Sequence, residues 1–365
     1  MDKGIHVLGL GNLGKYVAYA LMRRRAHFPP VTLMFHRTSL LADWKNADRS
    51  IRCTDKTHQG NLATEETRVE GFRVELLDDA AAAGNKELGA HQPDVTIGSK
   101  SPIKHLIVAT KTYATTAALT PIKDRLSKDS NVLFLQNGMG VTDEVSDALF
   151  PDPETRPTYW AGVCHAGVYS TSPFSIVHAG RGPLMVGAVG NRSRKPQDAP
   201  PLGSTNALLA QLSMAEMLET NILSGAIMQP QLTKLVINSI INPLTAIFNC
   251  KNGQVFESRE AKDLFHHLLE EAGAIVRALL PELEEAFSDE SLGSLVQHVA
   301  KQTAKNTSSM LQDVQAGRRT EIDYINGYLI SQGKRLGLPH KRHAAVYGMI
   351  KQLEVENREC PIRGA

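Results

Sequence analysis

Short apolar runs alternate with segments of helical periodicity in the first half of the chain. Four of these runs predict strands that are buried on both faces: Ile5–Leu8, Val31–Phe35, His105–Thr110 and Asn131–Leu135. Between them, Gly14–Arg24 and Ala114–Leu126 carry apolar residues at the spacing of a helix. Strands that alternate with helices predict an α/β fold with a parallel sheet covered on both sides.

The pattern weakens between residues 41 and 101, where only Val74–Leu76 has the composition of a strand. We interpret this region as part of the sheet, elaborated by surface loops. Three later runs predict further strands, for which antiparallel pairing is an option: Cys164–Ser170, Phe174–His178 and Leu184–Val189. Residues 191–204 are rich in proline, serine and charge, and they predict an exposed loop.

Strand patterns end near Ser224, and the rest of the chain predicts helices. The helical segments are Gln229–Phe248, Ala261–Leu280, Leu292–Ala304 and Ile322–Leu336. We therefore expect a Rossmann-like α/β domain at residues 1–222, with loop insertions near 41–101 and 191–204. An all-α domain is expected at residues 223–365. A chain of 365 residues is long enough for two domains.

Composition narrows the class of protein. Apolar residues make up 42% and charged residues 21%, and the formal net charge is +2, so neither nucleic acid nor a membrane is expected as a partner. No apolar run approaches the roughly 20 residues of a membrane span, and a strand already begins at Ile5, so no targeting segment is expected. Four widely spaced cysteines favour reduced thiols and a cytoplasmic protein: Cys53, Cys164, Cys250 and Cys360.

A glycine-rich turn follows the first predicted strand. Its residues are Gly9, Leu10, Gly11, Asn12, Leu13 and Gly14. In a dinucleotide-binding unit, Gly9 allows the tight turn, Gly11 lets a pyrophosphate approach the backbone, and Gly14 lets the helix pack closely on the strand. The helix then offers unpaired N–H groups to the anion. Its place between a strand and a helix favours this interpretation over a glycine-rich turn without a ligand.

The end of the second predicted strand bears on the choice of cofactor. The strand is followed by His36, Arg37, Thr38 and Ser39, without an acidic residue. An NAD enzyme usually has Asp or Glu here to bind the ribose 2′-hydroxyl, whereas a guanidinium can pair with a 2′-phosphate. Arg37 therefore favours NADPH, with a solvated arginine as the alternative.

A polar stripe crosses the first helix of the second half. Lys234, Asn238 and Asn242 are four residues apart and therefore share one face of an otherwise apolar helix. Asparagine is a poor residue for a helix interior, so a site that binds a polar substrate would explain the stripe. Pro243 would kink the helix or free a backbone carbonyl. The alternative is an exposed face with a snorkelling lysine.

Two further polar groups have plainer interpretations. Residues 306–327 supply hydroxyls and a carboxylate near a helix start, which alone would indicate a capped helix. Another group has helical spacing, and we interpret it as a solvated helix face rather than a metal site: His266, His267, Glu270 and Glu271. We expect no metal in this protein.

Four segments together resemble the 2-dehydropantoate 2-reductase, or ketopantoate reductase, family: Gly9–Gly14, Gln136–Gly140, Lys234–Gly253 and Ser308–Ile330. They stand in the right order over most of the chain, and the last two are long and specific. Members of the family reduce 2-dehydropantoate to (R)-pantoate with NADPH, on the route to pantothenate and coenzyme A. The resemblance implies a Rossmann domain, a helical domain like that of 6-phosphogluconate dehydrogenase, and a cleft between them. It leaves a homodimer as an option.

The resemblance also implies roles for individual residues. Lys234 matches the catalytic proton donor, and Glu321 matches an acidic residue of the active site. The implied cofactor-binding residues are Gly9–Gly14, Arg37, Lys111, Asn137, Gly167 and Glu321. The implied substrate-binding residues are Asn137, Lys234, Asn238, Asn242, Asn252 and Ser309.

The chemistry of these residue types agrees with the implied reaction. Hydride attack on a 2-oxo group builds negative charge on its oxygen, and an ammonium such as that of Lys234 stabilises this charge and delivers a proton. Glu321 could hold Lys234 or a substrate hydroxyl in place. A reductase of another 2-oxo acid is an alternative, because relatives can keep the lysine and change the substrate. A nicotinamide-binding sensor without catalysis is the third hypothesis, but it would not need Lys234, Asn238 and Glu321.

Overall fold

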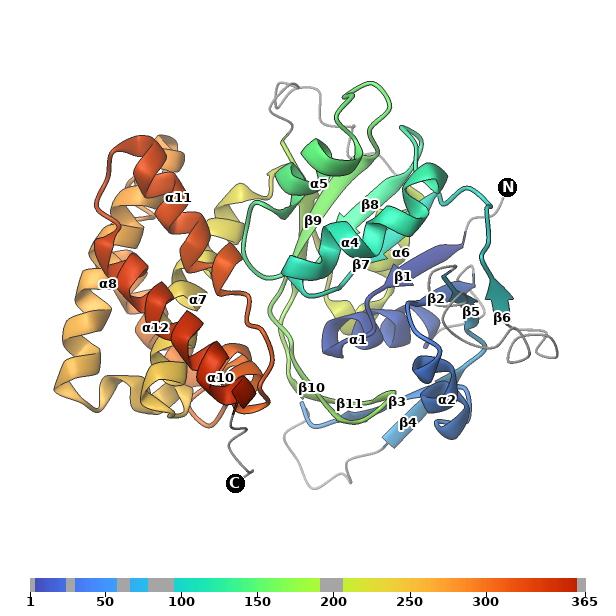
Figure 1. Cartoon of the computed structure of the whole chain (residues 1–365), viewed down its shortest axis with the longest axis horizontal. Coiled ribbons are helices and arrows are strands. Elements are labelled where there is room, and N and C mark those ends of the chain that lie inside the picture. Colours follow the sequence, from blue (N-terminus) through green and yellow to red (C-terminus); the bar gives the residue numbers. More distant parts are fainter. Residues whose placement is uncertain (1–3, 24–29, 58–65, 78–94, 191–205, 360–365) are drawn as a thin grey trace. The chain divides into compact units, whose positions relative to one another are not determined.

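The computed structural model describes residues 4–23, 30–57, 66–77, 95–190 and 206–359 of the 365-residue chain. The predicted loop at residues 191–204 and Cys360 lie outside these residues. The chain divides into two compact units, each described here by itself (Figure 1). The sheet unit comprises Met1–Gln136 and Thr142–Ile227, and the helical unit comprises Asn137–Val141 and Met228–Ala365.

Nine strands form the main sheet of the described sheet unit. In spatial order they are β13 (Asn221–Ala226), β12 (Leu184–Ala188), β9 (Thr158–Cys164), β8 (Asn131–Phe134), β7 (His105–Val108), β1 (Ile5–Leu8), β2 (Val31–Phe35), β5 (Arg73–Leu76) and β6 (Val95–Ile97). Neighbours from β9 to β6 are parallel, whereas β12 runs antiparallel to β9. Every residue of β1, β2 and β7 is buried, as the continuous apolar runs predicted.

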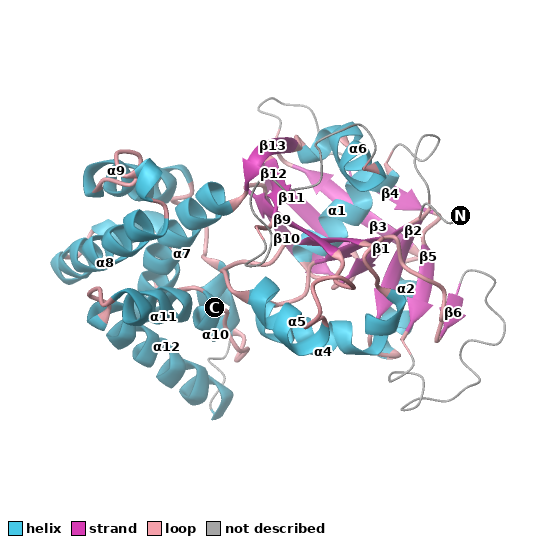
Figure 2. Ribbon diagram, turned by 90° about the horizontal axis from the view of Figure 1, so that it is seen from above, coloured by secondary structure: helices cyan, strands magenta, loops and turns pink. Residues whose placement is uncertain are grey.

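Helices cover both faces of the main sheet. They are α1 (Asn12–Met22), α2 (Ser39–Asn46), η3 (Thr112–Ala114), α4 (Thr115–Leu119), η4 (Thr120–Arg125), α5 (Val141–Leu149), α6 (Ala207–Met214) and η6 (Glu216–Leu218). Figure 2 shows α1 and α6 on one face and α4 and α5 on the other, which confirms the predicted layers. The single helix predicted at residues 114–126 is wrong. Pro121 has no N–H to continue the ladder, and α4 gives way to the 3₁₀ helix η4.

A second sheet of four strands packs against α1. Its order is β10 (Gly167–Ser172), β11 (Ser175–Gly180), β3 (Ser50–Asp55) and β4 (Glu66–Glu70). The predicted single strand at Cys164–Ser170 is therefore wrong, because the chain leaves the main sheet after β9 and enters the second sheet at β10. Because α1 contacts strands of both sheets, it is buried on both sides from Gly14 to Met22.

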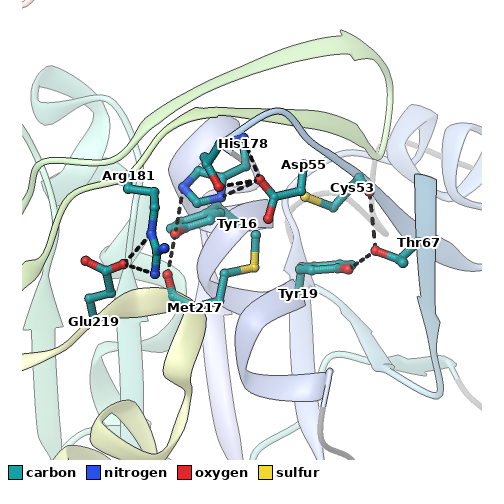
Figure 3. A network of polar contacts seen from close by, with 10 residues as sticks. Tyr16, Tyr19, Cys53, Asp55, Thr67, His178, Arg181, Met217 and Glu219 are labelled. Carbon is teal, nitrogen blue, oxygen red and sulfur yellow. Dashed lines mark hydrogen bonds and ion pairs between the residues drawn. The ribbon is translucent and has the colours of Figure 1, made fainter. Parts of the chain in front are cut away.

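A polar network joins α1 to the second sheet (Figure 3). The Tyr16 hydroxyl donates to the carbonyl of Met217 at 2.7 Å and lies 3.4 Å from Nε2 of His178. Nδ1 of His178 in turn lies 3.6 Å from Oδ1 of Asp55 in β3. These contacts hold the helix in place from the side opposite β1, and so they help to position the glycine turn at its N-terminus.

The helical unit packs its helices around one central helix. The elements are α7 (Met228–Phe248), η7 (Asn252–Phe256), α8 (Arg259–Leu279), η8 (Pro281–Leu283), α9 (Asp289–Gln302), α10 (Ser309–Gln315), η9 (Ile322–Tyr324), α11 (Asn326–Leu336) and α12 (Lys341–Glu359). Helix α7 contacts α8, α9, α10 and α12, and its apolar residues form much of the core. No helix in the described ranges is long and apolar enough to cross a membrane.

The sequence predicted α7, α8 and α9 within a few residues and indicated a capped helix start where α10 begins, but it missed α12. The helix predicted at residues 322–336 is divided, because Ile325 (φ −103°, ψ −86°) separates η9 from α11. Glu271 was misinterpreted as part of a solvated face. Its side chain is buried, and its carboxylate accepts the backbone N–H groups of Arg342 and His343 at 3.0–3.1 Å, at the start of α12.

Candidate functional site

The glycine turn at the carboxyl end of β1 has two glycines that the protein itself requires. Gly9 has φ +95°, and a Cβ there would lie 2.4 Å from the backbone nitrogen of Thr110. A Cβ on Gly14 would lie 1.9 Å from the carbonyl oxygen of Gly9. At Gly11, by contrast, a Cβ would meet no atom within 4 Å. The open space at Gly11, beside the N-terminus of α1, fits the close approach of a pyrophosphate.

The carboxyl ends of neighbouring parallel strands bring the other predicted cofactor residues to the same edge as this turn. Arg37 follows β2 and is exposed, and no carboxylate of the described residues is paired with it. Lys111 follows β7 and is half-buried, and its carbonyl accepts the N–H of Ala114 at 2.9 Å. Gly167 opens β10 beside Gly180, where a Cβ would meet only ordinary contacts.

Gln136 is a half-buried polar residue at this edge, to which no role was assigned from the sequence. It follows β8, and its Nε2 donates to the hydroxyls of Thr110 at 3.3 Å and Thr115 at 3.1 Å. Its Oε1 is buried and accepts no hydrogen bond from the part of the chain that the structure describes. The polar sequence Gln136-Asn137 directly after an apolar strand was the available signal.

Helix α7 carries the polar stripe as predicted. Lys234, Asn238 and Asn242 share one face, with the first two half-buried and Asn242 buried. The opposite side is built of fully buried residues such as Val236 and Ile240. The helix therefore presents an ammonium and two amides from a rigid, well-packed element.

Pro243 interrupts the hydrogen-bond ladder of α7, and another helix repairs the gap. Because proline has no N–H, the carbonyl of Ser239 loses its partner within the helix. Nδ2 of Asn326 donates to this carbonyl at 2.9 Å and lies 3.0 Å from Nδ1 of His343. Nε2 of His343 lies 3.0 Å from the carbonyl of Leu268. These contacts fit a neutral imidazole that accepts at Nδ1 and donates at Nε2.

Glu321 and Asn137 lie together in the helical unit, although 184 positions separate them in the sequence. Nδ2 of Asn137 donates to Oε2 of the buried Glu321 at 3.3 Å. The short segment that carries Asn137 is fixed by the backbone, since the N–H of Met139 donates to the carbonyl of Tyr324 at 2.9 Å. Gly138 is required there, because a Cβ would lie 2.4 Å from that carbonyl oxygen.

The turn that carries Glu321 is held by a carboxylate from α12. Glu354 is buried and accepts both the N–H and the hydroxyl of Thr320, at 2.7 and 2.6 Å. The Thr320 hydroxyl oxygen accepts the N–H of Ile322 at 3.2 Å. Glu321 therefore stands between two anchored residues, which limits the positions its side chain can take.

Asn252 is buried and half-satisfied. Its Nδ2 donates to Oγ1 of Thr303 at 2.9 Å, and this hydroxyl donates its only proton to the carbonyl of Val299 at 2.7 Å. Thr303 can therefore only accept from Asn252, which fixes the orientation of the amide. Oδ1 of Asn252 is buried and has no hydrogen-bond partner among the described residues, which is rare for a buried polar atom in native proteins.

Ser309 is the exposed first residue of α10, whereas its neighbour Ser308 is buried. Ser308 caps the helix by accepting the N–H of Leu311 at 3.1 Å, and it shares a hydrogen bond with Thr245 of α7 at 2.6 Å. The capped helix start considered from the sequence is therefore present, and it leaves the Ser309 side chain at the surface. Within the described ranges, no group of three His, Cys, Asp or Glu side chains is arranged to hold a metal.

Known proteins resemble this chain over both units. Residues 5–191 match the family model described as ketopantoate reductase PanE/ApbA, and residues 226–354 match the one described as ketopantoate reductase PanE/ApbA C terminal. A probable 2-dehydropantoate 2-reductase of Schizosaccharomyces pombe is 29% identical over 92% of this chain and 92% of its own length. A ketoisovalerate reductase of Gibberella fujikuroi is 27% identical over 97% of this chain and 84% of its own.

A solved structure shares the fold. This structure is the ternary structure of D-mandelate dehydrogenase with NADH and anilino(oxo)acetate. Its sequence is 18% identical to this chain, and the two structures superpose with a TM-score of 0.71. The similarity covers 97% of this chain and 98% of the other.

Proposed function

This chain belongs to the ketopantoate reductase PanE/ApbA family of oxidoreductases, and on that premise we propose that it reduces 2-dehydropantoate to (R)-pantoate with NADPH. The observation that carries the proposal is the polar face of α7, where Lys234, Asn238 and Asn242 stand opposite a fully buried apolar side of the helix. An ammonium with two neutral amides suits a small anionic substrate whose carbonyl oxygen must gain a proton.

The residues of the sheet unit fit a dinucleotide. Gly9–Gly14 would hold the pyrophosphate, which the open space at Gly11 supports. The exposed Arg37 would meet the 2′-phosphate, and its lack of an acidic partner among the described residues favours NADPH over NADH. The remaining contacts would come from Lys111, Asn137, Gly167 and Glu321.

NADPH, when bound, supplies a hydride to C2 of the 2-oxo acid. The ammonium of Lys234 stabilises the negative charge that develops on the C2 oxygen and transfers a proton to it, so that the carbonyl becomes a secondary alcohol. Asn137, Asn238, Asn242 and Ser309 hydrogen-bond the substrate. Glu321 is held by the Thr320 turn and by Asn137, and so its negative charge stays in one place near the ammonium of Lys234 and the substrate.

A second candidate substrate is 2-ketoisovalerate, which the similarity to the Gibberella fujikuroi enzyme favours. The two 2-oxo acids differ by a hydroxymethyl group, and the unpaired Oδ1 of Asn252 bears on the choice. This oxygen can only accept a hydrogen bond, which a substrate hydroxyl can donate and a carboxylate cannot. Asn252 therefore supports 2-dehydropantoate as the better substrate.

Initial rates with each 2-oxo acid and each nicotinamide test the proposal. We expect the highest kcat/KM for 2-dehydropantoate with NADPH. In Asn252→Leu the preference for 2-dehydropantoate over 2-ketoisovalerate should fall by about tenfold or more, because the acceptor is removed. A wild-type kcat/KM for 2-ketoisovalerate equal to or above that for 2-dehydropantoate would contradict the substrate assignment.

A further inference from the structure

The first turn of α1 contains a buried cation. Lys15 follows Gly14 directly and is only 6% exposed. The N-terminus of a helix already carries about half a positive charge, so a lysine is unfavourable there unless an anion is near. The first turn of α1 has no acidic residue. The position of Lys15 therefore opposes the usual preference for negative charge at a helix start.

The ammonium is held at this helix end by Ser170, whose hydroxyl is in turn held by Asn12. Nζ of Lys15 donates to Oγ of Ser170 in β10 at 2.5 Å, and this hydroxyl donates to Oδ1 of Asn12 at 2.6 Å. Ser170 belongs to the second sheet and is exposed, whereas Lys15 is buried. The three side chains thus form a continuous chain of hydrogen bonds beside the glycine turn.

No carboxylate of the described residues compensates the charge of Lys15. Burial alone lowers the pKa of its ammonium to about 8. A buried cation without a counterion costs free energy, which a ligand anion at the same place would offset. Two of the three N–H donors of the ammonium are also free for such a ligand, since only Ser170 accepts from it within the described ranges.

We propose that Lys15 binds the pyrophosphate of the dinucleotide, with Ser170 and Asn12 holding its ammonium at the N-terminus of α1. The inference rests on the proposed function, because the dinucleotide is the ligand. The glycine turn provides backbone N–H groups and open space, and Lys15 adds the full charge that these groups lack. The alternative is that Lys15 only ties α1 to the second sheet.

Equilibrium binding to Lys15→Met separates the two roles. Met has a similar length and no charge, so the variant should fold. We expect the Kd of NADPH to rise about 10- to 100-fold, the size typical of a lost charge-assisted hydrogen bond. The Kd of adenosine 2′-monophosphate, which has no pyrophosphate, should change less than twofold. In Ser170→Ala the Kd of NADPH should rise a few-fold. Lys123 is an exposed lysine of η4, and Lys123→Met should leave the Kd unchanged.

The possible outcomes are distinct. An unchanged Kd of NADPH in Lys15→Met, or an equal loss for both ligands together with a lower melting temperature, would leave Lys15 with a structural role and overturn the inference. A wild-type protein that binds NADPH but does not reduce 2-dehydropantoate would contradict the proposed function and leave the role of Lys15 in place. A wild-type protein that binds no dinucleotide would overturn both.

Discussion

The two units present their candidate functional residues in opposite ways. In the sheet unit the decisive feature is the absence of side chains, since a Cβ on Gly9 or Gly14 would collide with backbone. In the helical unit the decisive features are side chains that other segments hold, such as Glu321 behind the Thr320–Glu354 contacts. A site made by missing side chains is contained in six consecutive residues. A site made by supported side chains is spread over the unit and can be altered from a distance.

The largest expected effect comes from the reacting group itself. Lys234→Met should lower kcat by about 10²- to 10⁴-fold, because the proton donor and its charge are lost, while the Kd of NADPH stays near that of the wild type. Stopped-flow rates and fluorescence titration measure the two quantities. Lys262→Met, at an exposed position of α8, is the matched control. Turnover within twofold of the wild type would remove Lys234 from the mechanism.

The stability of the protein at acid pH should depend on His343, whose imidazole contacts the Asn326 amide that donates to the carbonyl of Ser239 in α7. Burial lowers the pKa of His343 to about 4, against smaller raising effects of the hydrogen bond to Leu268 and the charge of Glu271. The unfolded state therefore takes up this proton first. The contribution of the neutral His343 side chain to the free energy of unfolding is therefore complete above pH 6.5. It falls as the pH drops toward 4, by about 3 kcal/mol in all.

Urea unfolding of the wild type and of His343→Gln between pH 7.5 and 4 measures this contribution. The free energy of unfolding should fall more steeply in the wild type, because a protonated Nδ1 would face the Nδ2 donor of Asn326. Parallel curves for the two proteins would show that His343 does not cause the loss.

Cofactor choice should depend on one exposed side chain of the sheet unit. Arg37→Ala should lower kcat/KM with NADPH by about 10- to 100-fold, because a charge-assisted pair with the 2′-phosphate is lost. NADH lacks this phosphate and serves as the internal control, so its kcat/KM should stay constant. Equal losses with both nucleotides would place Arg37 outside 2′-phosphate recognition.

The smallest effect is expected at Glu354, which holds the turn that carries Glu321. Glu354→Gln should lower kcat by about three- to tenfold, because a neutral amide holds the N–H and hydroxyl of Thr320 less firmly than a carboxylate. The Kd of NADPH should change little. Glu356→Gln, on the exposed side of the same helix, is the control. Equal kcat values for the two variants would show that the Thr320 turn does not depend on the carboxylate of Glu354.

The sequence predicted those parts of the fold that a local pattern encodes. Six strands of the main sheet, the glycine turn and the polar stripe of α7 each depend on spacing within a few residues. The six strands are β1, β2, β5, β7, β8 and β12, whereas β6, β9 and β13 were not predicted. The second sheet was missed, because its centre pairs β3 with β11, from segments more than 100 residues apart. Neither strand carries a local sign of its partner.

The supporting residues of the helical unit were missed for the same reason. Pro243 predicted a freed carbonyl, but nothing near it in the sequence identified Asn326 as the donor. Glu271 has the spacing of a surface residue and is buried only because the start of α12 lies against it. Lys15 stands directly after the glycine turn, and its hydrogen bond to Ser170 depends on β10, whose bounds were not predicted from the sequence.

The segment Asn137–Val141 has a consequence for how this protein can be cut and recombined. It lies in the middle of the sheet unit's sequence, yet Met139 is buried in the core of the helical unit. A fragment that starts at Met228 would keep every helix of that unit but would have a hole where Met139 packs. Chimeras that exchange the C-terminal half with a relative must therefore exchange these five residues as well, so the gene is less modular than its two units suggest.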